Sequence, residues 1–188
     1  MPQEDNLETL MARYQQGDFA AATALVDRIT PLLHRFFLAQ HESRPEADDL
    51  LQETWLQIHK VRHTYRAGEP VLPWFYAIAR HIRVDHFRRS MRVTAGARKL
   101  EAMTKTEPTS RSAPDHGGNL EALLAPLSRA EREVIEMLKM AGMSIEEVAR
   151  VTSSSVGSVK QKAHRAYQKL RQRLAGMGHG KGRSGGQS

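Results

Sequence analysis

The chain has 188 residues, of which 40% are hydrophobic and 26% are charged, proportions that fit one or two small globular domains. Lysine and arginine number 28 against 21 acidic residues, and the formal net charge of +7 favours a polyanionic partner. The absence of cysteine excludes disulfides and thiol chemistry, and no apolar run approaches the length of a membrane span. The acidic N-terminal segment lacks the apolar core of a secretory signal, so we expect a cytoplasmic protein.

Residues 7–40 predict two helices that are separated at Gly17-Asp18, because apolar side chains recur there at helical spacing. Pro31 is expected to kink or restart the second helix. We find no chemistry in this segment and expect it to serve packing. Its apolar positions are Leu10, Tyr14, Phe19, Leu25, Val26, Ile29, Leu32, Leu33 and Phe36.

A third helix is predicted over residues 46–62, with Leu51, Trp55 and Ile58 on one face that should be buried. The opposite face places Leu56 among acidic and amide side chains. A single exposed leucine needs no explanation, but one ringed by polar groups can anchor a protein-binding patch. Because it is acidic, this face is not the DNA side. It comprises Asp49, Gln52, Glu53, Leu56 and Lys60.

Residues 64–72 predict a loop, and Pro73 suits the first turn of a fourth helix that runs to residue 92. Trp74 and Tyr76 begin this helix and cations follow, a combination that suits melted nucleic acid. The alternative is that all three aromatic residues at its start belong to the core. The side chains expected in the core are Phe75, Ile78, Ala79, Ile82 and Phe87. Those left to solvent are Arg80, His81, Arg83, Arg88, Arg89 and Arg92.

Histidines occur at two spacings that bear on metal binding. His59 and His63 lie four residues apart, but no third ligand lies nearby in the sequence. His81 and His86 lie five apart and diverge on a helix, so with Asp85 they resemble a metal triad in composition only. We therefore expect no metal, no cofactor and no catalytic residue.

Residues 93–119 lose the helical periodicity and become rich in Thr, Ser, Pro and Gly, which predicts a flexible linker with a helical turn near residues 98–103. The linker separates a helical domain at 1–92 from a second one at 120–175. Residues 176–188 form a Gly-rich basic tail that we expect to be disordered.

The second domain carries two capping boxes, Ser128 with Glu131 and Ser144 with Glu147. The serine run at 153–155 then predicts a turn between a short helix and a long one. The long helix, from about Val156 to Leu174, contains no acidic residue. Its apolar face carries Val156, Val159, Ala163, Ala166, Tyr167, Leu170 and Leu174, and its polar face carries Ser158, Gln161, Lys162, Arg165, Gln168, Lys169 and Gln172.

This arrangement predicts a helix-turn-helix whose second helix enters the major groove of DNA. Lysine and arginine there can neutralise phosphates, while serine, glutamine and arginine can bond base edges. The alternative is a solvated basic face on a structural helix. The expected fold is therefore all-α, with two small helical domains joined by a flexible linker.

Two segments resemble bacterial sigma factors of the extracytoplasmic-function group. DDLLQETWLQIHK followed by LPWFYAIARHIRVDHFRR is similar to sigma region 2, and LSRAEREVIEML through SVKQKAHRAYQKLR is similar to sigma region 4. The resemblance implies a non-catalytic initiation factor that binds core RNA polymerase and promoter DNA and helps to open the strands. It also implies an anti-sigma partner, which in such systems is often membrane-anchored, and no small-molecule substrate.

The resemblance also implies residue roles. The acidic helix docks on the clamp coiled coil of the largest polymerase subunit, and the family also contacts the polymerase flap. The polymerase-binding residues are Asp49, Gln52, Glu53 and Leu56. Residues 66–92 capture the minus-ten element through Trp74, Tyr76, Arg80, His81, Arg83, Arg88 and Arg89. The minus-thirty-five element is read by Ser155, Ser158, Lys160, Gln161, Lys162 and Arg165. By the same resemblance, the linker threads through polymerase near its active centre.

Three departures from the family pattern bear on the promoter sequence. His81 stands where many members have Asn, residues 160–162 read Lys-Gln-Lys rather than Lys-Ser-Arg, and Tyr167 stands where Arg is frequent. A stand-alone transcriptional regulator is the alternative, but it leaves the acidic face around Leu56 and the aromatic-basic helix without a purpose. A metal-dependent enzyme is a third hypothesis, without a convergent ligand set.

Overall fold

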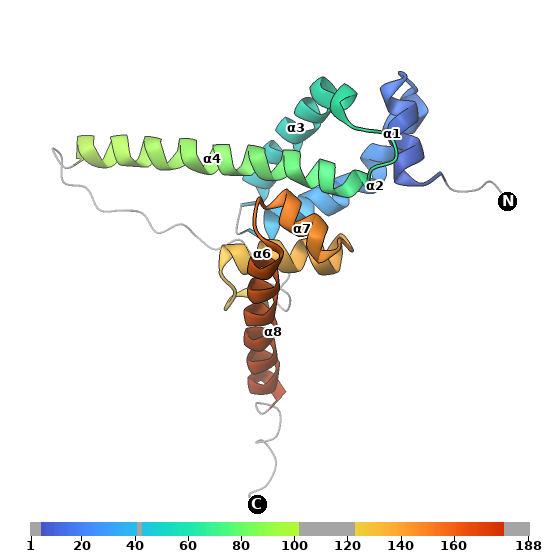
Figure 1. Cartoon of the computed structure of the whole chain (residues 1–188). Coiled ribbons are helices and arrows are strands. Elements are labelled where there is room, and N and C mark those ends of the chain that lie inside the picture. The colour runs from blue at the N-terminus through green and yellow to red at the C-terminus, as the bar shows by residue number, and fades with distance from the viewer. Residues whose placement is uncertain (1–4, 41–42, 102–122, 179–188) are drawn as a thin grey trace, which may run out of the picture. The chain divides into compact units, whose positions relative to one another are not determined.

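The computed structural model describes residues 5–40, 43–101 and 123–178, with side chains described outside 93–101 and 176–178. Within these residues the chain is helical and has no strand, which confirms the all-α prediction. In chain order the elements are α1 (Leu7–Gln15), α2 (Phe19–Leu38), α3 (Arg44–Val61), η1 (Arg62–Thr64), α4 (Val71–Glu101), α6 (Arg129–Ile135), η2 (Glu136–Met140), α7 (Ile145–Val151) and α8 (Val156–Gly178) (Figure 1).

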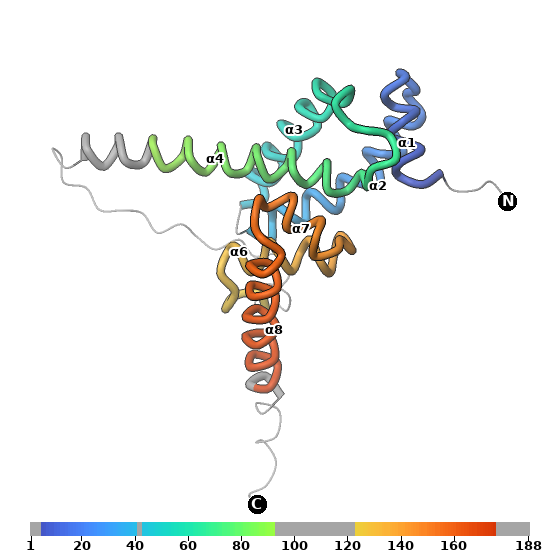
Figure 2. The backbone as a smooth tube through the Cα atoms, viewed as in Figure 1, coloured from blue at the N-terminus to red at the C-terminus, as the bar shows by residue number. Residues whose placement is uncertain are grey.

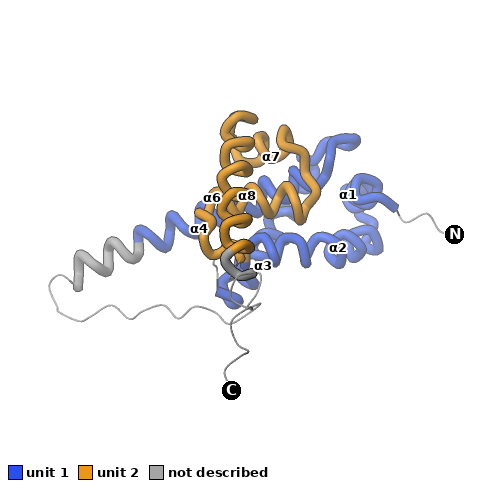
Figure 3. Tube along the Cα trace, turned by 90° about the horizontal axis from the view of Figure 1, so that it is seen from below, with its two compact units in different colours: residues 1–38, 42–114 blue, residues 39–41, 115–188 orange. Residues whose placement is uncertain are grey.

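The helices fall into two compact units (Figure 3). Unit 1 contains α1 to α4, and unit 2 contains α6 to α8. Among the described residues, no helix is long and apolar enough to cross a membrane.

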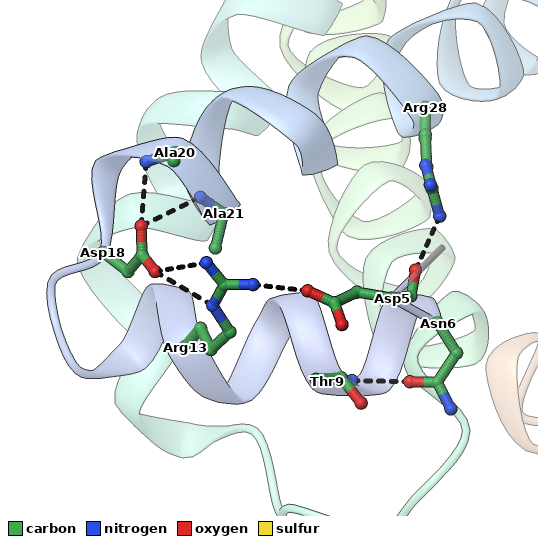
Figure 4. A network of polar contacts seen from close by, with 8 residues as sticks. All are labelled: Asp5, Asn6, Thr9, Arg13, Asp18, Ala20, Ala21 and Arg28. Atoms are coloured by element: carbon green, nitrogen blue, oxygen red, sulfur yellow. Dashed lines mark hydrogen bonds and ion pairs between the residues drawn. The ribbon is translucent and has the colours of Figure 1, made fainter. Parts of the chain in front are cut away.

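Polar contacts fix the junction of α1 and α2 (Figure 4). Asp18 caps α2 by accepting hydrogen bonds from the backbone N–H groups of Ala20 and Ala21, at 2.9 and 3.1 Å. Its carboxylate also binds the guanidinium of Arg13, which in turn reaches Asp5. The backbone N–H of Ala21 and the Arg13 guanidinium together hold the pKa of Asp18 below its usual range. The Gly17-Asp18 break is thus a capped turn.

The core of unit 1 forms around α2, whose buried residues recur at helical spacing. Tyr76 and Phe75 from α4 are fully buried, and the Tyr76 ring meets Phe36 edge-on with centroids 5.2 Å apart. Trp55 of α3 contacts Phe75 and donates a hydrogen bond to Thr30, at 3.0 Å. The α2 residues in this core are Ala21, Leu25, Ile29, Leu33, Phe36 and Phe37. Helix α2 runs through Pro31 without a restart.

Several apolar side chains that were predicted to be buried are exposed instead. Phe19 is 87% exposed, and Val26 and Phe87 also face solvent. On α3 the fully buried leucine is Leu50, whereas its neighbour Leu51 is half-buried. The predicted stripes are otherwise buried, as Leu25, Ile58 and Phe75 show, so the differences are confined to single positions at their edges.

Side chains of α1 form hydrogen bonds with the backbone of residues 62–71, the segment that leads into α4. The Gln15 side-chain amide donates hydrogen bonds to the carbonyls of Arg62 and Tyr65, at 2.7 and 2.9 Å. Glu8 accepts one from the backbone N–H of Val71, at 3.2 Å, where α4 begins. The path from α3 through this segment into α4 can be followed in Figure 2. These contacts fix both ends of the predicted loop.

Helix α4 continues to Glu101, past the boundary predicted at residue 92. Residues 95–101, AGARKLE, are rich in strong helix formers, which explains why the helix persists where the apolar period stops. Helix α8 likewise reaches Gly178, into the predicted tail. The rest of the predicted linker and tail lies outside the described residues.

Both predicted capping boxes of unit 2 are confirmed. Ser128 and Glu131 open α6, and Ser144 and Glu147 open α7, with each carboxylate accepting from the N-cap backbone N–H. A π-helical turn, η2, follows α6. Between α7 and α8, Ser153 takes a positive φ of 50° and closes the turn. Leu127, Ile135 and Ala166 form a core cluster with Leu124, Tyr167 and Leu170 packed against it.

Candidate nucleic-acid and polymerase interfaces

The predicted polymerase-binding residues lie together on the exposed face of α3. Asp49, Gln52 and Glu53 are exposed, and Leu56 is 58% exposed. The Glu53 carboxylate forms an ion pair with Arg89 of α4, with 3.1 Å between oxygen and nitrogen. The structure therefore brings this set into one patch, and one member already has a basic partner.

The aromatic residues at the start of α4 are mostly part of the core. Tyr76 is fully buried, so its ring does not face a DNA strand in this conformation. Trp74 is half-buried and lies edge-on to Tyr65 and Phe75, with centroids 5.8 and 5.4 Å apart. Of the two aromatic residues assigned to the minus-ten site, only Trp74 retains accessible surface.

The basic residues of α4 divide by exposure. His81 is exposed and lies 3.2 Å from Asp85, which also has Arg88 at 3.7 Å. Arg83, in contrast, is 4% exposed, and its guanidinium carbon lies 5.8 Å from the centroid of the Phe36 ring. Arg80 is half-buried. The side chains of this set that reach solvent freely are therefore His81, Arg88 and Arg89.

The histidines that were considered as metal ligands are placed differently. The His59 ring nitrogen Nδ1 lies 2.8 Å from the Tyr14 hydroxyl and shares a hydrogen bond with it. The described residues contain no group of three or more His, Cys, Asp or Glu side chains arranged to hold a metal ion.

The predicted minus-thirty-five residues occupy the turn and the first half of α8. The Ser155 hydroxyl oxygen accepts a hydrogen bond from the backbone N–H of Ser158, at 3.1 Å, and so caps the helix. Lys160, Gln161 and Arg165 are exposed. Lys162 is half-buried and donates to the hydroxyl of Ser154, at 3.3 Å. Ser158, Gln161, Lys162 and Arg165 thus share one polar face of the helix that follows the turn, whereas Lys160 lies about 160° around the axis from Ser158.

Sequence reasoning missed a carboxylate beside this basic face. Glu131 of α6 accepts a hydrogen bond from Lys169 Nζ, at 2.7 Å, and its other oxygen lies 3.7 Å from Arg165 Nε. Burial raises the pKa of Glu131, but hydrogen bonds from Lys169 and Ser128 outweigh it and leave the pKa below its usual range. The capping-box pattern predicted the bond between Glu131 and Ser128. It could not predict the contact with Lys169, because that residue lies 38 positions further along the chain.

The two units together indicate a DNA-binding protein that also binds a protein partner. Unit 2 is a helix-turn-helix domain whose long helix carries no acidic residue, and unit 1 is a helical bundle with an acidic patch on α3. A helix-turn-helix with a one-sided basic helix binds duplex DNA. The acidic patch with its exposed leucine is suited to a protein partner instead.

Comparison with known proteins gives the family. The description "Sigma-70 region 2" matches residues 25–93, and "Sigma-70, region 4" matches residues 118–170. The chain is 30% identical to the ECF RNA polymerase sigma factor SigF of Caulobacter vibrioides over 178 residues, which cover 91% of this chain and 95% of that protein. It is also 30% identical to the RNA polymerase sigma factor CarQ of Myxococcus xanthus over 168 residues, covering 87% and 95%. The chain therefore belongs to the ECF family of RNA polymerase sigma factors, which are non-enzymatic transcription initiation factors.

Solved structures support the same fold. The sigma factor RpoE of Bartonella quintana is 21% identical, with a TM-score of 0.62 and coverage of 81% of this chain and 96% of that one. CnrH is 24% identical, with a TM-score of 0.66 and coverage of 92% and 99%. Family membership favours the sigma-factor hypothesis over the stand-alone regulator and the metal-dependent enzyme.

Proposed function

We propose that this sigma factor binds core RNA polymerase through the α3 patch and reads two promoter elements with separate surfaces of units 1 and 2. The observation that carries the proposal is the sorting of exposed charge. The α3 patch combines carboxylates with the exposed Leu56, whereas α8 has no acidic residue. Polymerase supplies the chemistry, so the chain needs no catalytic residue, cofactor or small-molecule substrate and works in the cytoplasm with polymerase.

The α3 patch, defined as Asp49, Gln52, Glu53 and Leu56, docks on the clamp coiled coil of the largest polymerase subunit. Its exposed leucine supplies an apolar anchor, and the surrounding polar residues form the rim that a protein interface requires.

The minus-ten element is held along α4. The exposed His81, Arg88 and Arg89 neutralise phosphates or contact bases, and Trp74 offers a partly accessible ring for stacking. The buried Tyr76 and Arg83 and the half-buried Arg80 shape this surface from beneath.

The minus-thirty-five element is read by α8. Lys160, Lys162 and Arg165 provide phosphate contacts, while Ser155, Ser158 and Gln161 are of the side-chain types that bond base edges. Phosphate contacts supply affinity and base contacts supply specificity, so the promoter sequence depends mainly on the second group.

We also propose regulation by an anti-sigma factor that covers these surfaces until a signal arrives. The solved relative from Bartonella quintana is in complex with the anti-sigma factor NepR. The chemistry of the patch gives a simple test, because an inhibitor that competes with polymerase for Leu56 should lose affinity when Leu56 is truncated.

The deciding experiment is capture of core RNA polymerase followed by transcription from a library of random promoters. Capture together with enrichment of a two-block promoter motif supports the proposal. Absence of capture, combined with tight binding of the free protein to one duplex site, would support the stand-alone regulator.

Four variants separate the surfaces. Lys162→Ala and Arg165→Ala should weaken promoter use and leave polymerase capture intact, because they lie on α8. Glu53→Ala and Leu56→Ala should reduce polymerase capture. Equal loss of capture by all four variants would contradict the division of roles.

A further inference from the structure

Glu131 lies beside the basic face of α8 and binds two of its cations. Its side chain is 6% exposed, Lys169 Nζ lies 2.7 Å from one carboxylate oxygen, and Arg165 Nε lies 3.7 Å from the other. The same carboxylate accepts the backbone N–H of Ser128, at 2.8 Å, in the capping box that opens α6. A single side chain thus closes a cap and neutralises charge on the predicted recognition helix.

The two cations share the face that is predicted to meet DNA. At about 100° per residue, Arg165 and Lys169 fall about 20° to either side of Ser158 around the axis of α8. A lysine at 2.7 Å from a nearly buried carboxylate has its charge largely neutralised by that carboxylate, so a phosphate gains little from the same cation unless the ion pair opens. Leaving a buried charge without its partner is costly, so the contact persists unless DNA offers a better one.

The ion pair changes the ratio of sequence-independent to sequence-specific DNA binding. Contacts between cations and phosphates are independent of sequence, whereas contacts to base edges select it. A carboxylate that withholds cations from phosphates therefore reduces binding to every sequence and leaves the base-reading residues untouched.

We propose that Glu131 is a specificity-determining residue, which limits sequence-independent binding of α8 to duplex DNA by holding Lys169, while Arg165, at 3.7 Å and mostly exposed, stays available to DNA. The inference rests on the proposed function, since it concerns the helix assigned to the minus-thirty-five element. Glu131 acts through Lys169 and touches no base.

The chain provides a matched control in its second capping box. The Glu147 carboxylate accepts a hydrogen bond from the backbone N–H of Ser144, at 2.7 Å, and the Glu147 backbone N–H donates to the Ser144 hydroxyl, but Glu147 forms no ion pair with any described side chain. Glu131→Gln and Glu147→Gln raise the net charge equally and each alters a capping box, although Glu131 is buried and Glu147 half-buried, so the comparison controls for charge and cap while thermal unfolding of both variants controls for stability.

The test is fluorescence anisotropy of the full chain with a random-sequence DNA duplex over a series of salt concentrations. Each cation released onto a phosphate steepens the slope of log affinity against log salt by about 0.9, which is roughly tenfold tighter binding at about 50 mM salt. We expect this gain for Glu131→Gln and not for Glu147→Gln. Loss of structure alone would weaken binding, which is the opposite sign.

A second variant keeps the proposal testable if Glu131→Gln impairs folding. Lys169→Gln should leave the salt slope unchanged, because Lys169 is already paired with Glu131 and makes no phosphate contact. A slope that becomes shallower by about 0.9 would overturn the proposal. Equal slopes for Glu131→Gln and the unmodified protein would also overturn it, as would no measurable duplex binding by either at the lowest salt. The anisotropy assay contains no polymerase, so its result can be interpreted even if the chain fails to capture polymerase in the separate experiment.

Discussion

Truncation of Leu56 gives a quantitative test of the α3 patch. Complete burial of a leucine side chain is worth about 1.5–3 kcal/mol, and Leu56 is still 58% exposed in the free chain. Docking that covers the remainder therefore contributes about 0.9–1.7 kcal/mol. Because alanine retains part of that surface, Leu56→Ala should cost about 1 kcal/mol, or roughly a fivefold increase in the Kd for core polymerase.

The assay is a titration of labelled sigma factor with purified core RNA polymerase, read by fluorescence anisotropy. Val26→Ala is the matched control, because Val26 is 41% exposed but lies on α2, outside the patch. It should leave the Kd unchanged. Thermal unfolding of both variants checks that neither disturbs the fold.

Two results would refute the reasoning. An unchanged Kd for Leu56→Ala would mean that polymerase does not cover this side chain. An equal loss for Val26→Ala would mean that truncating any exposed apolar group weakens binding, so that Leu56 has no special position.

Three further outcomes are expected. In a double-mutant cycle of Glu53→Gln and Arg89→Gln, urea unfolding should give a coupling of about 0.2–1 kcal/mol, because the pair is solvent-exposed, and zero coupling would show that the contact does not form. Tyr76→Ala should lower the free energy of unfolding by about 3–5 kcal/mol through loss of a fully buried ring, whereas a stable variant with reduced promoter opening would show a direct DNA role. The lowered pKa of Glu131 means that the unfolded chain binds a proton more readily than the folded one, so this carboxylate stabilises unit 2 near neutral pH and the effect is lost as pH falls below the usual glutamate range. Acid unfolding of Glu131→Gln should be less steep over that range, and an identical profile would contradict this assignment.

Features set by neighbours in the sequence could be predicted well. Both capping boxes in unit 2 follow from a serine and a glutamate three residues apart, and both are present. The exposed position of Leu56 also followed from helical spacing. Such features depend on residues within one helix, so the local sequence is sufficient to predict them.

Features that depend on how elements pack could not be predicted. The choice between Leu50 and Leu51 is a rotation of about 100° around α3, and only the packing of its neighbours decides it. The same holds for Arg83, whose place beside Phe36 comes from a different helix. The contact between Glu131 and Lys169 joins α6 to α8, which local periodicity does not reveal.

The end of α4 shows a different limit. The prediction stopped the helix at residue 92 because apolar periodicity ended there, although residues 95–101 still favour a helix by intrinsic propensity. Apolar periodicity indicates which face of a helix is buried and does not by itself mark where the helix ends, so the loss of the period at residue 92 was not evidence for a helix end.

Under the proposed function, the contacts from α1 to the segment before α4 have a consequence for promoter opening. A loop that must become ordered when it captures a nucleotide loses conformational entropy at that moment, which subtracts from its affinity. Here Gln15 already holds the carbonyls of Arg62 and Tyr65, and Glu8 holds the N–H of Val71. Part of that entropy is therefore lost when the protein folds. Under the proposed function, the binding energy of a base held beside this segment then remains available to keep the strands apart.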